Sequence, residues 1–431
     1  MNKYQQNATS FCEICSSGFY DKLKILFTAH CIQESILLEA VCLLKPFISM
    51  LKPWYLFPIL LWLASCRANN EPGGRCTLEA TGHSLEYPLE GNTRQTIKAL
   101  FPYRDRDGQE YLTFQTSPGH TLVFYEMATG RLAFEIRPEL EGPDGTGPFL
   151  GYYIDDLDHI YLTALGKAEL ICIDREARIR KKITYDEAAD HTPLYASNAL
   201  SFVYKPVYRL EDKLYILSEC NRLASPNPVS ACLDTATGRI QALPFSYPRF
   251  PGSENKAKAY GVESSLSRCF DGRRFVYSFH FDENLYVAAP DHREVRKIPA
   301  RSRYIKQVEI PDEQAAYSFA RMLRRMCETP NYGNLLYDPY RKVYYRLAYP
   351  PTEIDPSENC TDIWQYGRKK FSILILDENL QVIGETLFPE NTYNSTLLFV
   401  REDGLYLSTG YFRNPDFDED WLVFRRFRLC R

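Results

Sequence analysis

One cysteine pair near the start of the 431-residue chain has the spacing of metal ligands. Cys12 and Cys15 are separated by two residues, and His30 and Cys31 follow. Thiolate and imidazole groups bind zinc, but a structural zinc site needs four ligands, usually from two closely spaced pairs. This part of the sequence offers no second pair with that spacing. The zinc interpretation therefore depends on one pair, and the residues that follow favour a different role for the segment.

Cys66 stands where a different thiol chemistry is expected. Met50-Leu51-Lys52 is a short basic start, and Trp54–Leu63 is an apolar run too short for a resident transmembrane helix. Leu63-Ala64-Ser65 then places small residues before the cysteine, as at the cleavage site of a signal peptide. The tetrapeptide resembles the bacterial lipobox, in which the cysteine thiol is lipidated and becomes the mature N-terminus. An ordinary signal peptide with a chance cysteine is the alternative.

Processing at Cys66 would divide the chain into four segments. Residues 1–49 would lie upstream of the true start, residues 50–65 would be the signal peptide, and residues 66–77 would be a flexible tether before the folded part, 78–431. The whole chain has 51 basic and 55 acidic residues, and removing the 5 basic and 4 acidic residues of 1–65 leaves 46 and 51, a net charge of −5. That balance, without a basic stripe, argues against nucleic acid as a partner.

Eight cysteines follow Cys66, in a compartment that permits disulfides. Cys220 and Cys232 are expected on the second and third strands of one repeat, which makes them the best-placed pair for a bridge. The alternative is that these cysteines are small buried side chains.

Sequence motifs of the common enzyme classes are absent from the chain. It contains no Gly-x-Ser-x-Gly, no His-Glu-x-x-His, no phosphate-binding loop with its lysine and no dinucleotide fingerprint. The glycine-rich stretch Glu141–Gly147 has no lysine and is interpreted as a turn. The six histidines that follow Cys66 show no metal-ligand spacing. Any catalytic site would therefore have to combine residues that are distant in sequence.

Short strands must position any such residues. Residues 149–183 read as four β-branched and aromatic runs joined by polar turns, which favours strand over helix. The pattern recurs five more times. Aligned on the second strand of each unit, the spacings are 50, 54, 61, 68 and 62 residues, and the anchors are Tyr111, Tyr161, Tyr215, Val276, Tyr344 and Tyr406. Four-stranded units at such periods predict a six-bladed β-propeller, with an open solenoid or two sandwiches as the alternative.

The sixth unit ends after its third strand, which would leave an exposed sheet edge. Residues 83–89, which precede the first unit, have strand character. We therefore expect this segment to add the fourth strand of the last blade and close the ring.

Long connections should gather on one face of such a propeller, where binding sites are common. Three of their aromatic residues, Tyr247, Trp364 and Tyr366, could stack on a ligand, or else pack the loops down. Residues 312–328 predict an inserted helix, with Asp312 as cap. Its Arg321 and Arg325 could meet an anion or lie on a solvated face.

A calcium-dependent hydrolase is the alternative to a binding role. Propellers of the lactonase type hold calcium in the channel through Asn, Asp and Glu, and a hard cation there could polarise an ester. Four candidate ligands near the starts of inner strands do not align at one depth: Asn198, Glu263, Asn334 and Asn394.

The whole pattern resembles a family of lipid-anchored, TolB-like six-bladed β-propellers of unknown function from Gram-negative envelopes. The resemblance rests on Leu63–Cys66, the six tyrosine-type strands, residues 141–145 and residues 336–346, and it covers residues 78–431. It implies an outer-membrane location through Cys66, with the leaflet left open, and no assigned catalytic residues or cofactor. We therefore expect a non-catalytic module that binds a peptide, a glycan or an envelope protein.

Overall fold

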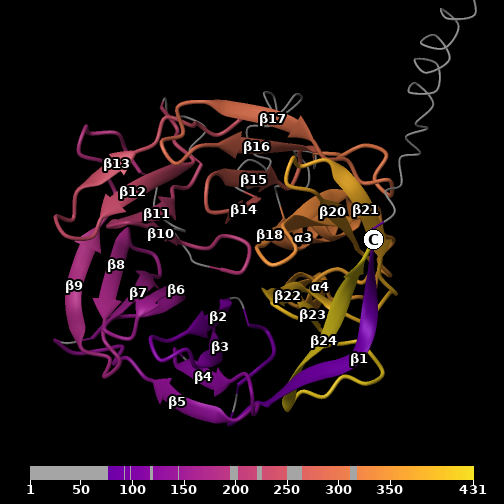
Figure 1. Ribbon diagram of the computed structural model, residues 1–431, viewed down its shortest axis with the longest axis horizontal. Coiled ribbons are helices and arrows are strands. Elements are labelled where there is room, and N and C mark those ends of the chain that lie inside the picture. Colours follow the sequence, from indigo (N-terminus) through magenta and orange to yellow (C-terminus); the bar gives the residue numbers. More distant parts are fainter. Residues whose placement is uncertain are drawn as a thin grey trace, which may run out of the picture. The chain divides into compact units, whose positions relative to one another are not determined.

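Six four-stranded antiparallel sheets follow one another around a ring (Figure 1). The computed structural model describes residues 76–431 except 92, 98, 117–119, 144, 195–201, 221–225, 250–264 and 311–317. The predicted Cys66 anchor, the segments before residue 76 and two of the calcium candidates, Asn198 and Glu263, lie outside the described residues. The expected six-bladed β-propeller is confirmed.

Each of the first five blades uses four consecutive strands, numbered from the channel outward. Blade 1 contains β2 (Leu100–Arg104), β3 (Glu110–Gln115), β4 (Leu122–Glu126) and β5 (Leu132–Ile136). Blade 2 contains β6 (Phe149–Asp156), β7 (His159–Ala164), β8 (Glu169–Ile173) and β9 (Ile179–Thr184). Blade 3 contains β10 (Tyr208–Leu210), β11 (Lys213–Leu217), β12 (Ser230–Asp234) and β13 (Ile240–Ala242).

The second half of the ring repeats this order, with one change in the last blade. Blade 4 contains β14 (Leu266–Phe270), β15 (Phe275–Phe279), β16 (Asn284–Ala288) and β17 (Val295–Pro299). Blade 5 contains β18 (Asn331–Asp338), β19 (Val343–Tyr349), β20 (Ser372–Leu376) and β21 (Val382–Leu387). Blade 6 contains β22 (Asn394–Arg401), β23 (Gly404–Ser408), β24 (Trp421–Cys430) and, as its outer strand, β1 (Thr77–Pro88).

The position of a strand within its blade explains its sequence. Second strands such as β15, β19 and β23 are buried at every residue, because both of their faces are covered by neighbouring blades. These strands are accordingly almost continuous apolar runs. In outer strands such as β9 and β17, exposed positions lie between more buried ones. The local hydrophobic pattern therefore encodes both the strand and its depth in the blade.

Strand β1, here called the clasp strand, closes the ring as expected. It pairs antiparallel with β24, with Leu85 opposite Phe424 and Tyr87 opposite Leu422. The strand begins earlier than predicted, at Thr77, and has a bulge between Ala80 and Ser84. The first and last parts of the chain thus share one sheet, at the side of the ring where β1 and β24 run together in Figure 1.

Two buried arginines join neighbouring blades. Arg268 on β14 donates to the Ser230 hydroxyl, twice to the Pro206 carbonyl and once to the Tyr215 carbonyl, at distances of 2.5–3.2 Å. Arg346 on β19 makes four comparable bonds to blade 4. A buried guanidinium is tolerated when its donors are satisfied in this way.

Two short helices lie among the long connections. Helix α3 (Phe319–Glu328) confirms the second part of the helix predicted for 312–328, while residues 312–317 lie outside the described part of the chain. Helix α4 (Cys360–Tyr366) was not predicted. Leu323 and Cys327 of α3 pack against Cys360 and Ile363 of α4. Among the described residues, neither helix is long and apolar enough to cross a membrane.

The predicted bridge between Cys220 and Cys232 is wrong, since the structure holds no bond between them. Cys232 lies opposite Tyr215 in the β11–β12 pair. Cys220 lies beside Asn227, whose amide nitrogen is 3.4 Å from the Cys220 sulfur. At about 3.3 Å per residue, this register separates the two cysteines by about 16 Å, whereas a disulfide needs Cα atoms within about 7 Å.

Candidate functional site

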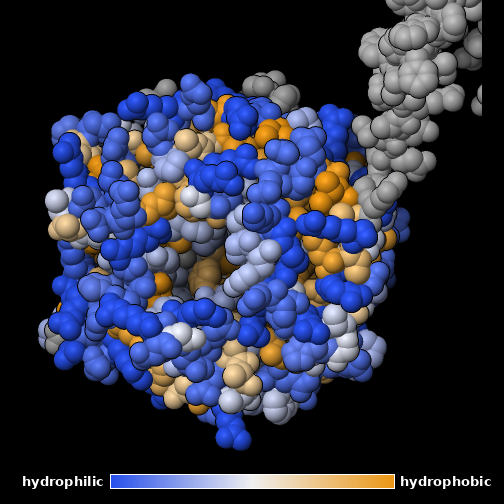
Figure 2. All heavy atoms as spheres, in the orientation of Figure 1, coloured by the Kyte–Doolittle hydropathy of each residue, from blue (hydrophilic) through white to orange (hydrophobic). Residues whose placement is uncertain are grey.

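The ring encloses two cavities, and the space-filling view shows a hollow at its centre (Figure 2). The cavity at the short-turn end measures about 600 Å³ and is lined by the last residues of the inner strands. Its wall is mainly apolar and includes aromatic side chains such as Tyr103, Tyr208 and Tyr337 from three different blades. These side chains lie on the inner strands, an element that recurs in every blade.

The second cavity, here called the long-loop cavity, measures about 550 Å³. It is lined by the first residues of inner strands, including Leu150, Leu266 and Asn331, and by parts of the long connections. Residues from α3, from α4 and from blades 2 to 6 reach its wall, together with Ile97 before blade 1. The face on which the sequence places the long connections therefore carries a cavity of the size that small ligands occupy.

Two of the three predicted aromatic binding residues line the long-loop cavity. Trp364 of α4 is 52% exposed, and Tyr247 is buried, with its hydroxyl donating to the Ser218 carbonyl at 2.6 Å. Tyr366, on the same helix as Trp364, instead packs against Phe412 and Phe417. The structure therefore places Trp364 and Tyr247 at the site and gives Tyr366 a packing role.

The predicted arginines of α3 do not reach this cavity. Arg321 is exposed, and Arg325 lies 3.9 Å from Glu328 one turn away. Their neighbour Arg324 donates to the carbonyls of Ile354, Asp355 and Pro356 and so fixes the loop before α4. It is Met326 and Cys327 of this helix that line the cavity.

Three basic residues that the sequence analysis did not identify as site residues stand in the cavity wall: Lys205, His280 and Arg368. They come from the segment before β10, the end of β15 and the segment after α4. Seventy-five and 88 residues separate them in the chain, so no spacing pattern could reveal them. Ring closure brings them to one wall.

Arg368 is held by a small set of partners. Its Nη1 donates to the Cys327 carbonyl, and its guanidinium lies 5.1 Å from the centre of the Tyr349 ring. The amide oxygen of Asn331, turned so that both of its amide atoms are satisfied, accepts from Nη2 at 3.0 Å. No carboxylate of the described residues lies within 4.0 Å of it, and burial lowers the pKa of the Arg368 side chain.

His280 and Lys205 both lie near the Tyr204 ring. The ring centres of His280 and Tyr204 are 6.5 Å apart, and the Lys205 ammonium is 5.8 Å from the Tyr204 ring. Burial, together with the charges of Lys205, Arg346 and Arg368, lowers the pKa of His280 to about 3, so the imidazole is neutral at pH 7. Its Nε2 has no hydrogen-bond partner among the described residues. Burial lowers the pKa of Lys205 to about 8, against the opposing effect of Glu219.

The two calcium candidates within the described residues do not form a ligand set. Asn334 lines the cavity, where its amide nitrogen is 3.5 Å from the Thr396 carbonyl. Asn394 is fully buried, and its amide oxygen accepts from the nitrogen and hydroxyl of Thr396 at 2.9 and 2.6 Å. Its oxygen is therefore already engaged, which leaves only Asn334 able to present an oxygen to the cavity.

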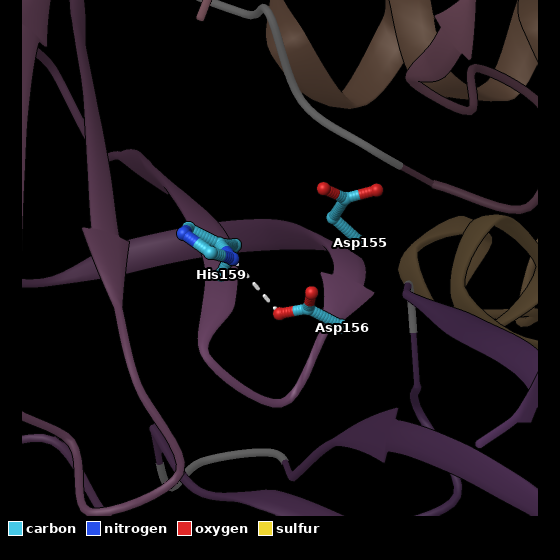
Figure 3. Close-up of side chains that lie close together, drawn as sticks. All are labelled: Asp155, Asp156 and His159. Atoms are coloured by element: carbon cyan, nitrogen blue, oxygen red, sulfur yellow. Dashed lines mark hydrogen bonds and ion pairs between the residues drawn. The ribbon is translucent and has the colours of Figure 1, made fainter. Parts of the chain in front are cut away.

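A separate acidic cluster lies on the hairpin between β6 and β7 (Figure 3). The ligand atoms of Asp155, Asp156 and His159 lie within 4.8 Å of one another. Asp156 contacts His159 at 2.9 Å and Arg106 of blade 1 at 2.5 Å, and Asp155 forms an ion pair with Arg209 of blade 3. Burial opposes ionisation of Asp156, but these hydrogen bonds outweigh it and lower its pKa. The cluster is therefore compensated by cations and links three blades, and we assign it no metal.

Comparisons with known proteins agree with this architecture. A crystal structure of a DUF4221 family member from Bacteroides vulgatus matches at 25% identity and a TM-score of 0.70, covering 83% of this chain and 99% of that one. A candidate exported protein from Bacteroides fragilis matches at 11% identity and a TM-score of 0.50, covering 83% and 96%. A candidate TolB from Agrobacterium tumefaciens matches at 10% identity and a TM-score of 0.37, covering 82% and 99%.

No curated protein sequence matches the chain. The family model of DUF4221, described as a domain of unknown function, matches residues 95–387, which span blades 1 to 5. The resemblance to a propeller family of unknown function is thereby confirmed. The chain belongs to the DUF4221 family.

Proposed function

We propose that this propeller is a non-catalytic binding module, and that the long-loop cavity receives part of a peptide, a glycan or an envelope protein. The observation that carries the proposal is the composition of the cavity wall. An exposed tryptophan, Trp364, stands there together with cationic and amide groups at the entrance to a rigid ring. Concave sites with aromatic walls and a few convergent polar groups are typical of ligand binding.

The chemistry of the wall supports binding over catalysis. A nucleophilic enzyme needs a hydroxyl or thiol hydrogen-bonded to its base. His280 is the only histidine among the described lining residues, and its Nε2 has no such partner among them. The calcium-dependent hydrolase gains no support from Asn334 and Asn394, because the Asn394 oxygen is bonded to Thr396.

Replacing Trp364 by alanine should weaken ligand binding about tenfold or more, because exposed aromatic anchors dominate binding energy. The full-length protein in detergent would be screened on glycan and peptide arrays, and the affinity of each hit measured by calorimetry. Trp421→Ala is the matched control, since Trp421 is 41% exposed on β24, outside the cavity wall. Hits that bind both variants as tightly as the parent protein would show that the ligand site lies elsewhere.

We also propose that the propeller is tethered to the outer membrane through lipidated Cys66. Residues 63–66 support this, as does the name of the Bacteroides fragilis relative, a candidate exported protein with the same fold. The proposal does not specify which leaflet of the outer membrane holds the lipid.

The lipidation proposal predicts that Cys66→Ser moves the protein from the outer-membrane fraction to the soluble fraction of lysed cells. Serine cannot form the thioether on which the lipid is built. The measurement is immunoblotting of membranes separated on a density gradient, with Cys76→Ser as the control. Retention of the Cys66→Ser protein in the membrane would exclude this anchor.

A further inference from the structure

The described residues give the long-loop cavity an excess of positive charge. Among them, the charged residues of its wall are Lys205, Arg368 and Glu219, and His280 is neutral at pH 7. Glu219 is the anion whose field acts on Lys205. Arg368 has no carboxylate of the described residues within ion-pair distance. It is half-buried, and a cation held in a cavity without a counter-ion is costly, so that a bound anion would lower this cost.

Comparison with the two buried arginines makes half-buried Arg368 distinctive. Arg268 and Arg346 each form four hydrogen bonds to carbonyl or hydroxyl oxygens of neighbouring blades. The Arg368 guanidinium has two such partners among the described residues, the Cys327 carbonyl and the Asn331 amide oxygen. A guanidinium carries five N–H donors in a fixed fork. Several donors of Arg368 are therefore left for a ligand in the cavity that it lines.

His280 supplies a second, independent indication of a ligand. Its Nε2 is enclosed and makes no hydrogen bond with the described residues, although it belongs to the same cavity wall. Buried polar atoms are nearly always paired, so an orphan in a cavity wall points to a partner that enters the cavity. In the tautomer with its proton on Nε2, this neutral imidazole donates to an oxygen of an anion.

The balance of charge selects the class of anion. One unmatched guanidinium fits a monoanion, and its planar fork matches the two oxygens of a carboxylate. Glu219 in the same wall would repel a dianion such as a phosphate monoester. The remaining wall combines the aromatic ring of Trp364 with the amide of Asn334, which suits the C–H face and a hydroxyl group of a sugar ring.

We propose that the long-loop cavity binds a carboxylated saccharide. Arg368 holds the carboxylate, the His280 Nε2 donates to one of its oxygens, and Trp364 covers the sugar ring. The proposal rests on the binding function proposed above and narrows its ligand to one chemical class.

The test compares an acidic sugar with its uncharged methyl ester. Galacturonate and the methyl ester of galacturonic acid are titrated by calorimetry into the full-length protein in detergent. The affinity for the acid should be about tenfold higher or more, because charge-assisted bonds to Arg368 are lost in the ester. Arg368→Gln should abolish this preference, so that acid and ester bind with similar affinity. Arg321→Gln is the matched control, since Arg321 is exposed on α3 and lies outside the cavity wall.

Two further variants keep the test informative if Arg368→Gln fails to fold. Arg368→Lys keeps the charge but loses the fork, so it should lower the affinity for the acid more than the affinity for the ester. His280→Phe should also lower the affinity for the acid, by a smaller factor. Equal affinity of the parent protein for acid and ester, binding of neither, or an affinity for the acid that is unchanged in both Arg368→Lys and His280→Phe would overturn the proposal.

Competition by salts separates the ligand classes. Sodium acetate should displace galacturonate, and inorganic phosphate should do so less well. Stronger displacement by phosphate would overturn the carboxylate assignment. Neutral array hits whose binding depends on Trp364 would overturn the proposal of an acidic ligand, while the proposed binding function would stand. Hits whose affinity is unchanged by Trp364→Ala would contradict the proposed binding site.

Discussion

Arg346→Met should lower the free energy of unfolding by about 3–5 kcal/mol, because it removes a buried charged donor that four oxygen atoms share. Arg346 is fully buried on β19. It donates to the Ser278 hydroxyl at 2.9 Å, to the Glu283 and Ala300 carbonyls at 2.8 Å, and to the Asp282 carbonyl at 2.6 Å. All four acceptors belong to blade 4 or to the connection that follows it.

The size of this effect comes from the acceptors and not from the arginine alone. Methionine is long and flexible enough to fill much of the space, so the loss of packing is small. The carbonyls that remain, however, face an apolar side chain in place of a charged donor. The guanidinium also lies 3.6 Å from the centre of the Tyr332 ring, a cation–π contact that methionine does not reproduce.

Chemical denaturation of Arg346→Met, followed by tyrosine fluorescence, measures the predicted loss. Arg296→Met on β17 is the control, because Arg296 is exposed on an outer strand, and its stability should change by about 0.5 kcal/mol at most. A loss below about 1 kcal/mol at Arg346 would mean that water or a shifted blade satisfies the abandoned carbonyls.

The blades could be predicted from the sequence because each strand carries its own signal. The tyrosine anchors Tyr111, Tyr161 and Tyr344 each lie in the second strand of a blade, where both faces are covered. The clasp followed from counting strands, since the last unit lacked one. Both inferences use patterns within a few residues or a rule about exposed edges.

Features that depend on long-range contacts could not be predicted in the same way. Helix α4 has only seven residues and follows a proline-rich loop, although its Asn359 cap and the positive φ of Gly367 match ordinary helix-end preferences. The disulfide prediction failed because the β11–β12 register was unknown. Lys205, His280 and Arg368 carry no local signature, since their meeting depends on the closed ring.

The two buried arginines, in contrast, have a recognisable signal in the sequence. Arg268 and Arg346 interrupt strands that are otherwise apolar, in Leu266–Phe270 and Val343–Tyr349. A lone charge in such a run indicates an enclosed hydrogen-bonding role, because an unpaired charge would be too costly there. Arg368 lies outside any strand and gives no such sign.

Tyr87→Ala should lower the free energy of unfolding by about 3–5 kcal/mol, the range for removing a large buried aromatic side chain. Tyr87 is fully buried at the end of the clasp strand β1. Its ring packs edge-on against Tyr125 of blade 1, 5.7 Å away, and against Phe424 of blade 6, 6.3 Å away. The alanine variant therefore loses contacts on both sides of the seam that closes the ring, and thermal unfolding measures the loss.

Tyr87→Phe separates the ring from the hydroxyl at the same position. The hydroxyl makes no hydrogen bond with the described residues, and burial holds the pKa of Tyr87 well above its usual value. Removing an unsatisfied buried hydroxyl should leave stability unchanged or raise it by about 1 kcal/mol. A loss in the phenylalanine variant would reveal a partner for the hydroxyl. If the alanine variant still unfolds in one transition, the clasp and the six blades form a single cooperative unit, whereas an early partial transition would show that β1 detaches before the ring opens.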